Sequence, residues 1–356
     1  MNKLTKELIN SIDSQNMYQL LKDYWKHTST AIESARKSTA KYSSKKNITE
    51  IVILGIGGSA ISGELIKSYL AVAAPEKNIK VVIVRGNEVL HNITDETCII
   101  ASSYSGNTWE TLDALDICMQ KTKNIIGITS GGKLKKICDS NNFPVLDLPT
   151  GMMPRCAIMY SFFQLLYLFK REGILDTLAV EPAVEEILSR VDSEQFDYSN
   201  LAENNIAMHI SNKLYNKLPI VYSSAYRTDA VNLRLRAQIQ ENADMFAFGG
   251  FIPEACHNEI NGWTYPEDLV NRFVVIFIKD KEDHEEITKT MDVYINLLTD
   301  KRVEVIELEG SGENLLARLF DLICICDWIS FFLAITNGTD PTPIPEIIKL
   351  KSIVGK

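Results

Sequence analysis

The sequence has little of several features that would narrow its function at once. No apolar run approaches the roughly 18 residues that a membrane-spanning helix needs, and the first residues lack the apolar centre of a signal peptide. Basic residues are outnumbered, with 37 Lys and Arg against 46 Asp and Glu, so the net charge is −9. Nucleic-acid and membrane binders normally carry a basic face. We therefore expect neither partner, and any anionic ligand must be held by local donors.

The cysteines are scattered and do not form a framework. Their number is odd, at 7, and no Cys-x-x-Cys pair occurs, which argues against a disulfide scaffold or a zinc site. Most lie in apolar stretches, where a free cysteine behaves as a small hydrophobic residue. The composition predicts a soluble protein of the reducing cytoplasm.

What is present is the pattern of an α/β protein. A chain of 356 residues is long enough for two domains at roughly 100–200 residues each. Residues 1–46 are predicted to be helical. After them come short apolar runs rich in β-branched residues, separated by stretches long enough for a helix, which is typical of a doubly wound parallel sheet. These runs are Ile51–Gly55, Val81–Val84, Cys98–Ala101, Ile125–Thr129 and Pro144–Leu148.

The second half repeats this architecture on a smaller scale. The apolar stretch 155–169, after Pro154, predicts a buried helix at a domain or subunit interface. Further apolar runs (LPIVYS, FVVIFI and VEVIEL) begin at Leu218, Phe273 and Val303, and a helix is expected over 313–335. The prediction is two doubly wound α/β domains, each a parallel sheet flanked by helices. The expected boundaries are 1–175 for the N-terminal domain, 176–197 for a connector and 198–356 for the C-terminal domain.

A glycine-rich loop, GIGGSAISG, follows the first apolar run and opens a predicted helix. Its glycines let the backbone approach a ligand closely, and the N–H groups of a helix start bind anions. The spacing from Gly55 approaches the dinucleotide fingerprint G-x-G-x-x-G, but Ala60 occupies the third glycine position. The acidic residue expected after the second strand is also missing, because the sequence there is VRGN, residues 84–87. By itself the loop indicates either an anion site or a tight turn without a ligand.

A second loop, SSYSGNT over residues 102–108, again joins an apolar run to a predicted helix. The hydroxyls of Ser103, Ser105 and Thr108 form a cluster of neutral donors that can hold a phosphate without lysine. A serine-rich helix cap is the alternative. Both loops follow strands of one sheet at their carboxyl ends, where open α/β folds bind ligands. Together they favour a phosphate-bearing small molecule.

These two loops resemble the sugar isomerase (SIS) domain. Later segments resemble the bifunctional phosphoglucose/phosphomannose isomerases: LPTGMMPRCA at 148–157, QENADMFAFGGFIPEACHNEINGW at 240–263 and DPTPIPEIIKLK at 340–351. The resemblance implies two SIS domains and a cofactor-free aldose–ketose isomerase. Such an enzyme interconverts glucose 6-phosphate and mannose 6-phosphate with fructose 6-phosphate through a cis-enediol.

That reaction needs a carboxylate, a ring-opening group, a cation and a phosphate anchor. The resemblance implies that Glu241 moves the proton between C1 and C2. It also implies that His257 opens the sugar ring in the site of a neighbouring subunit, and hence a homodimer. Without the resemblance, Glu241 reads as a solvated surface carboxylate and His257 as a helix-end histidine bonded to a carboxylate. The other histidines lie in polar surroundings and are expected at the surface.

Arg155, directly after Pro154, can stabilise the enediolate oxyanion, with an interface salt bridge as the alternative. By resemblance, Thr342 contacts the sugar and Lys349 assists ring opening, with Lys351 as the other candidate lysine. No further metal ligands lie near His257-Asn258-Glu259, so no metal is expected. The expected substrate and phosphate contacts are Gly57, Gly58, Ser59, Ser103, Ser105, Thr108 and Thr342.

Two other functions are compatible with parts of the sequence. A non-catalytic SIS module that senses sugar phosphates would need the loop 102–108, called the serine loop below, but not Glu241, Arg155 and His257 together. An aminosugar-phosphate isomerase shares the phosphate loop and the enediol chemistry, but it ordinarily carries an ammonia-supplying domain that this sequence does not show.

Overall fold

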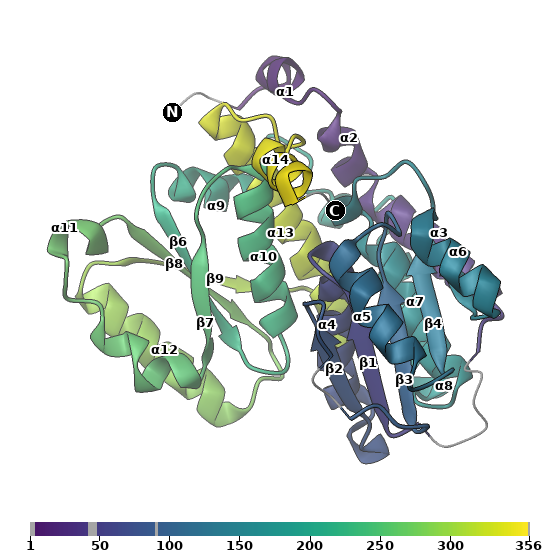
Figure 1. Ribbon diagram of the computed structural model, residues 1–356. Coiled ribbons are helices and arrows are strands. Elements are labelled where there is room, and N and C mark those ends of the chain that lie inside the picture. Colours follow the sequence, from purple (N-terminus) through teal and green to yellow (C-terminus); the bar gives the residue numbers. More distant parts are fainter. Residues whose placement is uncertain (1–3, 42–47, 90–91, 355–356) are drawn as a thin grey trace. The chain divides into compact units, whose positions relative to one another are not determined.

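The computed structural model describes residues 4–41, 48–89 and 92–354, and it has the predicted α/β fold with two parallel sheets (Figure 1). The chain forms two compact units. Lys26–Leu188 is here called the five-stranded unit, and Met1–Trp25 with Ser189–Lys356 is called the four-stranded unit.

The five-stranded sheet is parallel throughout, in the order β2-β1-β3-β4-β5. Each apolar run predicted in the first half forms a strand: β1 (Glu50–Leu54), β2 (Lys80–Val84), β3 (Thr97–Ser102), β4 (Ile125–Thr129) and β5 (Val145–Asp147). The central strands are buried on both faces, which is why their sequences are continuously apolar. The strand order reverses between β1 and β3, and such a switch point leaves a crevice at the carboxyl ends of the strands.

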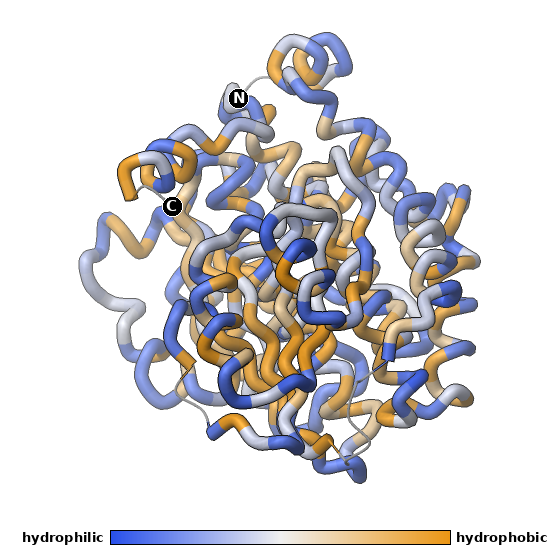
Figure 2. Tube along the Cα trace, turned by 45° about the vertical axis from the view of Figure 1, so that its right-hand side comes forward, coloured by the Kyte–Doolittle hydropathy of each residue, from blue (hydrophilic) through white to orange (hydrophobic). Residues whose placement is uncertain are grey.

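Helices cover both faces of this sheet. α5 and α6 pack on the face that carries Val52 and Ile99, whereas Gly63 of α4 lies against Ile53 on the opposite face. Hydrophobic residues gather along the strands, while the surrounding helices alternate between hydrophobic and hydrophilic residues (Figure 2). The helices and 3-10 turns are α3 (Tyr24–Lys37), α4 (Gly58–Ala73), η1 (Pro75–Lys77), α5 (Trp109–Met119), α6 (Gly132–Asn141), η2 (Pro154–Cys156), α7 (Ile158–Arg171) and α8 (Thr177–Leu188).

α7 begins later than the sequence predicts. The expected helix covers 155–169, but Pro154–Cys156 forms a separate 3-10 turn, and α7 starts at Ile158. α7 packs against α4, and its last residue, Arg171, donates to the carbonyl oxygen of Ala35 in α3 at 3.1 Å. α7 is thus held against two helices of its own unit.

The division into units differs from the predicted boundaries at two places. Residues 4–25 pack on the C-terminal half of the chain, where the Tyr24 hydroxyl donates to the carbonyl oxygen of Phe320 at 3.1 Å. α8, inside the predicted connector 176–197, belongs to the five-stranded unit, and the four-stranded unit resumes at Ser189. Contacts between residues far apart in the sequence cause both differences.

The four-stranded sheet is also parallel, in the order β7-β6-β8-β9, so it has a similar reversal of strand order between β6 and β8. β7 has no counterpart among the predicted apolar runs, because its sequence, FGGFI, contains two glycines. A Cβ on Gly249 would lie 2.0 Å from the carbonyl oxygen of Val221, so a larger residue does not fit there. The strands are β6 (Leu218–Ser224), β7 (Phe248–Ile252), β8 (Phe273–Lys279) and β9 (Glu304–Glu309).

α13, the predicted long helix, is the hydrophobic centre of the four-stranded unit. It is long and apolar enough to cross a membrane, which a search for uninterrupted apolar runs misses because charged residues such as Arg318 and Asp327 interrupt it. Every residue from Leu315 to Thr336 is buried. The charges are paired, Arg318 with Asp280 at 2.6 Å and Asp327 with Arg234 at 2.7 Å, as a core helix requires.

The remaining helices of this unit surround α13 and the sheet. They are α1 (Lys6–Ile12), α2 (Met17–Lys22), α9 (Ile206–Leu214), α10 (Asp229–Asn242), α11 (Glu267–Val270), α12 (Glu285–Asp300) and α14 (Pro345–Val354), with the 3-10 turns η3 (Glu194–Phe196), η4 (Glu254–His257) and η5 (Glu259–Asn261).

Candidate active site

The switch point of the five-stranded sheet brings the two predicted phosphate loops together. β1 and β3 are hydrogen-bonded neighbours, and the loops after them lead into α4 and α5. Gly57, with a φ of 57°, precedes α4, and Thr108 precedes α5; neither makes a side-chain capping bond to a described residue. In the first turn of α4 the Ser59 N–H donates to the Ile56 carbonyl oxygen at 3.2 Å and the Ala60 N–H to that of Gly57 at 3.0 Å. The dipoles of both helices favour an anion at their starts.

The hydroxyls predicted to hold phosphate form one cluster. Ser103 Oγ lies 2.9 Å from Thr108 Oγ1. Ser105 is exposed, and its Oγ accepts a hydrogen bond from the Asn107 N–H at 3.3 Å. Ser59, in the first turn of α4, is partly exposed on the neighbouring loop. We call these two loops the phosphate cradle, because they offer neutral donors suited to an anion in an acidic chain.

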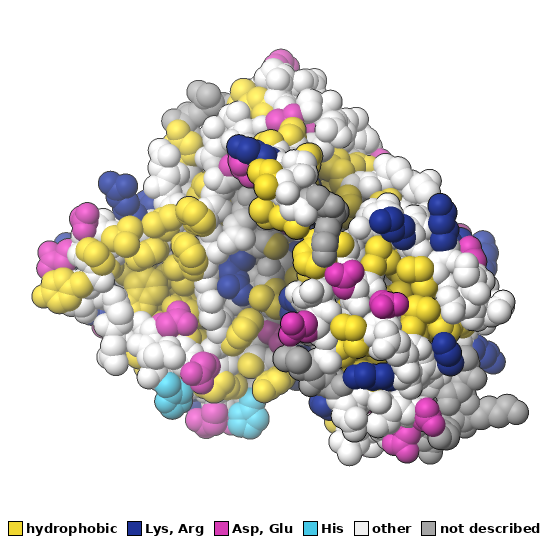
Figure 3. Space-filling view, in the orientation of Figure 1, with side chains coloured by type: hydrophobic (Ala, Val, Ile, Leu, Met, Phe, Trp, Pro, Cys, Tyr) yellow, Lys and Arg dark blue, Asp and Glu magenta, His cyan; other side chains and the backbone are white. Residues whose placement is uncertain are grey.

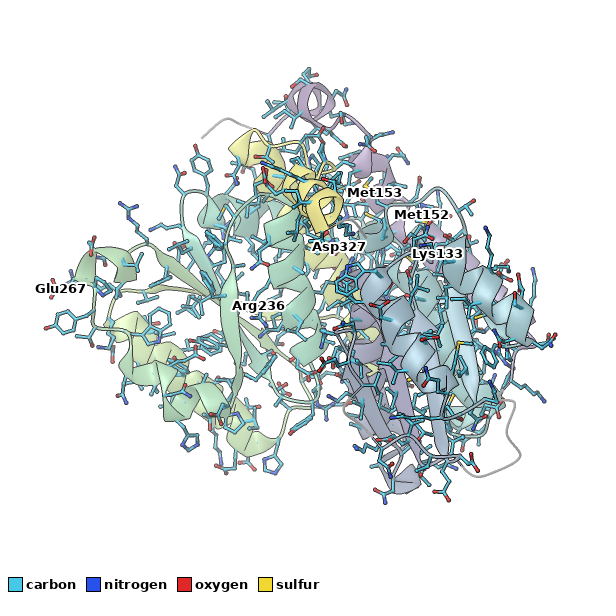
Figure 4. All side chains as sticks on the ribbon, viewed as in Figure 1. Lys133, Met152, Met153, Arg236, Glu267 and Asp327 are labelled. Atoms are coloured by element: carbon cyan, nitrogen blue, oxygen red, sulfur yellow. The ribbon has the colours of Figure 1, made fainter. Side chains whose placement is uncertain are left out.

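A third loop, SGGK after β4, packs against the serine loop and is absent from the predicted site. Gly106 has a φ of 67°, and a Cβ there would lie 1.8 Å from the carbonyl oxygen of Gly131. The Lys133 N–H donates to Asn107 Oδ1 at 3.1 Å, and Lys133 is exposed at this end of the sheet (Figure 4). The sequence did carry a signal for this loop, since a serine and glycines between an apolar strand and a helix repeat the pattern of the first two loops.

Arg155 lies at the edge of the cradle. It is buried, with 7% of its surface exposed, in the turn η2 between β5 and α7. This turn faces α4, because a Cβ on Gly58 would lie 3.4 Å from the Pro154 carbonyl oxygen and 3.7 Å from Arg155 Cα. The backbone of Arg155 therefore borders the first turn of α4, and a guanidinium carries the full positive charge that can stabilise a developing oxyanion.

Tyr104 connects the serine loop to the loop that precedes Arg155. Its hydroxyl donates to the Pro149 carbonyl oxygen at 2.7 Å and accepts from the Met152 N–H at 2.9 Å. Burial raises the pKa of Tyr104 and the Met152 N–H opposes that rise, so the hydroxyl stays protonated near neutral pH. Sequence reasoning missed Tyr104, because a tyrosine within a serine-rich loop carries no spacing signal.

In the four-stranded unit, Glu241 lines a cavity of about 660 Å³. Glu241 lies in the last turn of α10, partly buried, and the first turn of α14 lines the same cavity. The wall is partly apolar and partly acidic, and the volume is within the usual range for a small-molecule site. The described residues that line it are Ala237, Gln240, Glu241, Asp244, Met245, Phe246, Ile344, Pro345, Glu346 and Ile347.

Buried polar contacts to α13 hold α10 in place. The Arg234 guanidinium donates two hydrogen bonds to the Asp327 carboxylate, at 2.9 and 2.7 Å, and Gln238 donates to the same carboxylate at 3.0 Å. One turn further, Asn242 donates to Ser330 Oγ at 2.9 Å. These bonds fix the end of α10 that borders the cavity; Asp327 is labelled on α13 in Figure 4.

Comparison with known proteins agrees with both halves of this description. Residues 44–166 match the SIS domain, and residues 203–354 match the bacterial phospho-glucose isomerase C-terminal SIS domain. A protein of Caldicellulosiruptor bescii named bifunctional phosphoglucose/phosphomannose isomerase is 35% identical over 309 residues, covering 86% of this chain and 90% of that protein. The chain belongs to the bifunctional phosphoglucose/phosphomannose isomerase family. The prediction of two SIS domains is confirmed.

One further relative and one solved structure are also similar to this chain. A D-glucosamine-6-phosphate 4-epimerase of Sulfolobus acidocaldarius is 34% identical over 240 residues, covering 67% of this chain and 71% of that protein. The C-terminal domain of glucosamine-fructose-6-phosphate aminotransferase from Francisella tularensis superposes with a TM-score of 0.68 at 13% identity, covering 92% of this chain and 97% of that chain. The second likeness concerns the fold alone.

In this isomerase-family chain, the remaining predicted site residues belong to the four-stranded unit. His257 is exposed at the end of η4, Thr342 is buried, and Lys349 and Lys351 are both exposed on α14. None of these four is among the described residues that line the Glu241 cavity.

The segment that carries His257 is tied to the sheet through Glu259. The Tyr222 hydroxyl of β6 donates to Glu259 Oε2 at 2.7 Å. The Tyr294 hydroxyl lies 3.4 Å from that of Tyr222 and accepts from the Trp263 indole N–H at 2.8 Å. Glu259 therefore anchors η5 to the four-stranded sheet, together with the preceding turn η4, which carries His257.

The switch point of the four-stranded sheet is filled by ion pairs. Asp280, directly after β8, contacts Arg318 at 2.6 Å and Arg227 at 3.5 Å. Burial raises the pKa of Asp283, against hydrogen bonds from Ser224 and the Asp280 backbone. This end of the sheet presents paired charges where the five-stranded sheet presents hydroxyls and N–H groups, so it is not built to receive a phosphate.

The remaining histidines and the acidic residues are also candidate metal ligands. No group of three His, Cys, Asp or Glu side chains gathers as metal ligands would in the ranges that the structure describes. His209 and His284 are exposed, as predicted. His27 is half-buried instead, with Nδ1 3.3 Å from the Tyr160 hydroxyl, because α3 packs on α7. His91 lies outside the described residues.

Proposed function

We propose that this protein is an aldose–ketose isomerase that interconverts glucose 6-phosphate and mannose 6-phosphate with fructose 6-phosphate through a cis-enediol. The observation that carries the proposal is Glu241, a carboxylate on the wall of a ligand-sized cavity, in a chain that also has a phosphate cradle beside buried Arg155. The Caldicellulosiruptor bescii relative of that name supports it. The proposed chemistry uses no metal and no organic cofactor.

In the proposed reaction the cradle holds the phosphate. Hydroxyls donate from the serine loop, and N–H groups donate from the start of α4. Anchoring the phosphate leaves the sugar carbons free to react and makes the binding energy available to position them. The proposed contacts are Gly57, Gly58, Ser59, Ser103, Ser105 and Thr108.

The proton transfers are assigned to the remaining residues. His257 and Lys349 open the ring by exchanging protons with the ring oxygen and the C1 hydroxyl. Glu241 then takes the C2 proton of the open aldose and returns it to C1, while Arg155 stabilises the enediolate oxygen in between. Thr342 contacts the sugar. Glucose and mannose 6-phosphates differ only at C2, so one enediol serves both when Glu241 can protonate either face.

A coupled assay that detects fructose 6-phosphate tests the proposal. Wild-type protein is expected to turn over both aldose phosphates, also in the presence of a chelator. Glu241→Gln is expected to lower kcat by at least about 100-fold, as removal of a general base does, while calorimetry still shows fructose 6-phosphate binding. Glu267→Gln, an isosteric change at an exposed position on α11, is the matched control and should leave turnover unchanged.

Three outcomes contradict the proposal. Wild-type-like turnover by Glu241→Gln would show that Glu241 is not the catalytic base. Loss of turnover with chelator would show that a metal takes part. Sugar-phosphate binding without turnover in the wild type would favour the non-catalytic sensing module.

A second candidate is chemistry on an amino sugar phosphate. Asp244 and Glu346 line the cavity beside Glu241, and carboxylates at such positions can bind the ammonium group of glucosamine 6-phosphate. The Sulfolobus acidocaldarius relative is named an epimerase of that compound. Glucosamine 6-phosphate, followed by NMR in parallel with the hexose phosphates, separates the two. Conversion of the amino sugar alone would replace the isomerase proposal.

We also propose that the active form is a cytoplasmic homodimer in which His257 reaches the neighbouring subunit's site. His257 is exposed at the end of η4, as a donated residue must be. Phe246 and Phe248 stack with ring centres 5.8 Å apart although they are 71% and 50% exposed. Hydrophobic side chains gather over the four-stranded unit on the face shown in Figure 3, and such patches usually mark interaction sites.

A further inference from the structure

Tyr104 is the point at which three loops of the five-stranded unit meet. It lies in the middle of the serine loop, and its carbonyl oxygen accepts from the Ser130 N–H at 3.0 Å and from the Ser130 hydroxyl at 2.6 Å. Its own hydroxyl holds Pro149 and Met152, as described above. One residue therefore ties the loop after β4 through its backbone and the loop after β5 through its side chain.

The loop after β5 leads directly to Arg155. Met152, whose N–H is held by Tyr104, is three residues before Arg155 in the chain. The turn Pro154–Cys156 follows at once, and Arg155 is buried in it. A hydrogen bond at Met152 therefore limits where the guanidinium can lie, since few backbone torsions separate the two.

We propose that Tyr104 is a positioning residue, through which phosphate bound to the serine loop orders the loop 149–155 and places Arg155. The inference rests on the proposed function, in which the serine loop holds the phosphate and Arg155 stabilises the enediolate. Ser103 and Ser105 flank Tyr104, so an anion that fixes these two residues also restrains the backbone of Tyr104, from which the ring carries the hydroxyl to Pro149 and Met152. Phosphate-binding energy is then used to place a cation needed at the transition state.

Hydrogen exchange followed by mass spectrometry tests this coupling without any isomerase activity. In wild-type protein, inorganic phosphate is expected to slow exchange both in the serine loop and in residues 149–157. In Tyr104→Phe, which keeps the ring and the backbone, phosphate is expected to protect the serine loop alone. Tyr69→Phe removes another buried hydroxyl of the same unit, in α4 three turns after its start, and should behave as wild type.

Two results of this experiment overturn the proposal. One is equal protection of residues 149–157 by phosphate in Tyr104→Phe and in wild-type protein. The other is the absence of that protection in wild-type protein, which is decisive even when the variant does not fold.

Kinetics provide a readout that a purely structural role would not move. Tyr104→Phe is expected to lower kcat about tenfold with KM changed less than about twofold, because Arg155 is misplaced while the phosphate contacts remain. Arg155→Lys should then cost less in the Tyr104→Phe background than in wild type. A raised KM at unchanged kcat would assign Tyr104 to phosphate binding alone and overturn the proposal. Intact coupling by exchange without wild-type isomerase activity would refute the proposed function and not the coupling.

Discussion

Single residues decide the shape of the phosphate cradle, and Gly106 is the clearest example. It has a φ of 67°, a conformation that glycine adopts at little cost, and a Cβ there would overlap the carbonyl oxygen of Gly131 at 1.8 Å. Both constraints follow from the way the serine loop turns to let the next loop pack on it. The hydroxyl cluster of Ser103 and Thr108 depends on this packing, since it lies on the same short loop.

Gly106→Ala should therefore weaken phosphate binding and lower stability by about 1–3 kcal/mol, the usual cost of a strained backbone position. Calorimetry with inorganic phosphate and urea unfolding measure the two effects. Gly173→Ala is the matched control, because Gly173 has a φ of 70° but nothing within 4 Å of its Cβ position. It should lose stability through strain alone and keep phosphate affinity. Equal phosphate affinity in both variants would contradict the packing argument.

At the scale of secondary-structure elements, the pair α10 and α13 supports the proposed catalytic base. Arg234, Gln238 and Asn242 recur along one face of α10 and meet Asp327 and Ser330 on α13. A buried ion pair adds little net stability when intact, yet losing one partner is costly because the other charge stays buried. The polar face of α10 therefore fixes how the helix lies on α13, and the cavity wall follows from that.

Asp327→Ala is expected to destabilise the protein by about 3–5 kcal/mol, because it leaves the Arg234 guanidinium buried without the carboxylate. Urea denaturation followed by circular dichroism measures the loss. Glu285→Ala breaks an exposed pair with Lys289 and should change stability little. Similar urea midpoints for the two variants would show that the contacts of Asp327 contribute no more to the free energy of unfolding than an exposed ion pair does.

For the whole molecule, the proposed homodimer makes a prediction that a self-sufficient monomer does not. Glu241→Gln and His257→Ala should each be inactive as pure proteins. After the two are unfolded together and refolded, half of the dimers are mixed, and each mixed dimer has one site with both native residues. Activity is therefore expected to recover to about a quarter of wild type. Each variant refolded alone is the control, and no recovery on mixing would place His257 in its own subunit's site.

Sequence patterns predicted the strands well where the physics is local. A strand buried on both faces needs a continuous apolar run, and β1, β3 and β4 lie on such runs. β7 has no such run, because the close approach of Gly249 to β6 requires glycine and not a bulky residue. Likewise, nothing in residues 1–25 indicates that Tyr24 contacts Phe320, since that contact joins positions almost a chain length apart.

The sequence by itself determined the α/β class with two domains and the neutral phosphate loops, because these depend on short-range periodicity and on residues that are neighbours in the chain. Its resemblance to known isomerases implied that both domains are SIS domains. Only the tertiary structure decided which of the distant residues meet. It brought the loop after β4, which contains Gly131, onto the serine loop. It placed Tyr104 between the serine loop and the loop before Arg155, and it put Glu241 on a cavity wall formed with α14. The physical reason is that such contacts are selected by packing between elements, and their energies depend on geometry that chain spacing does not encode.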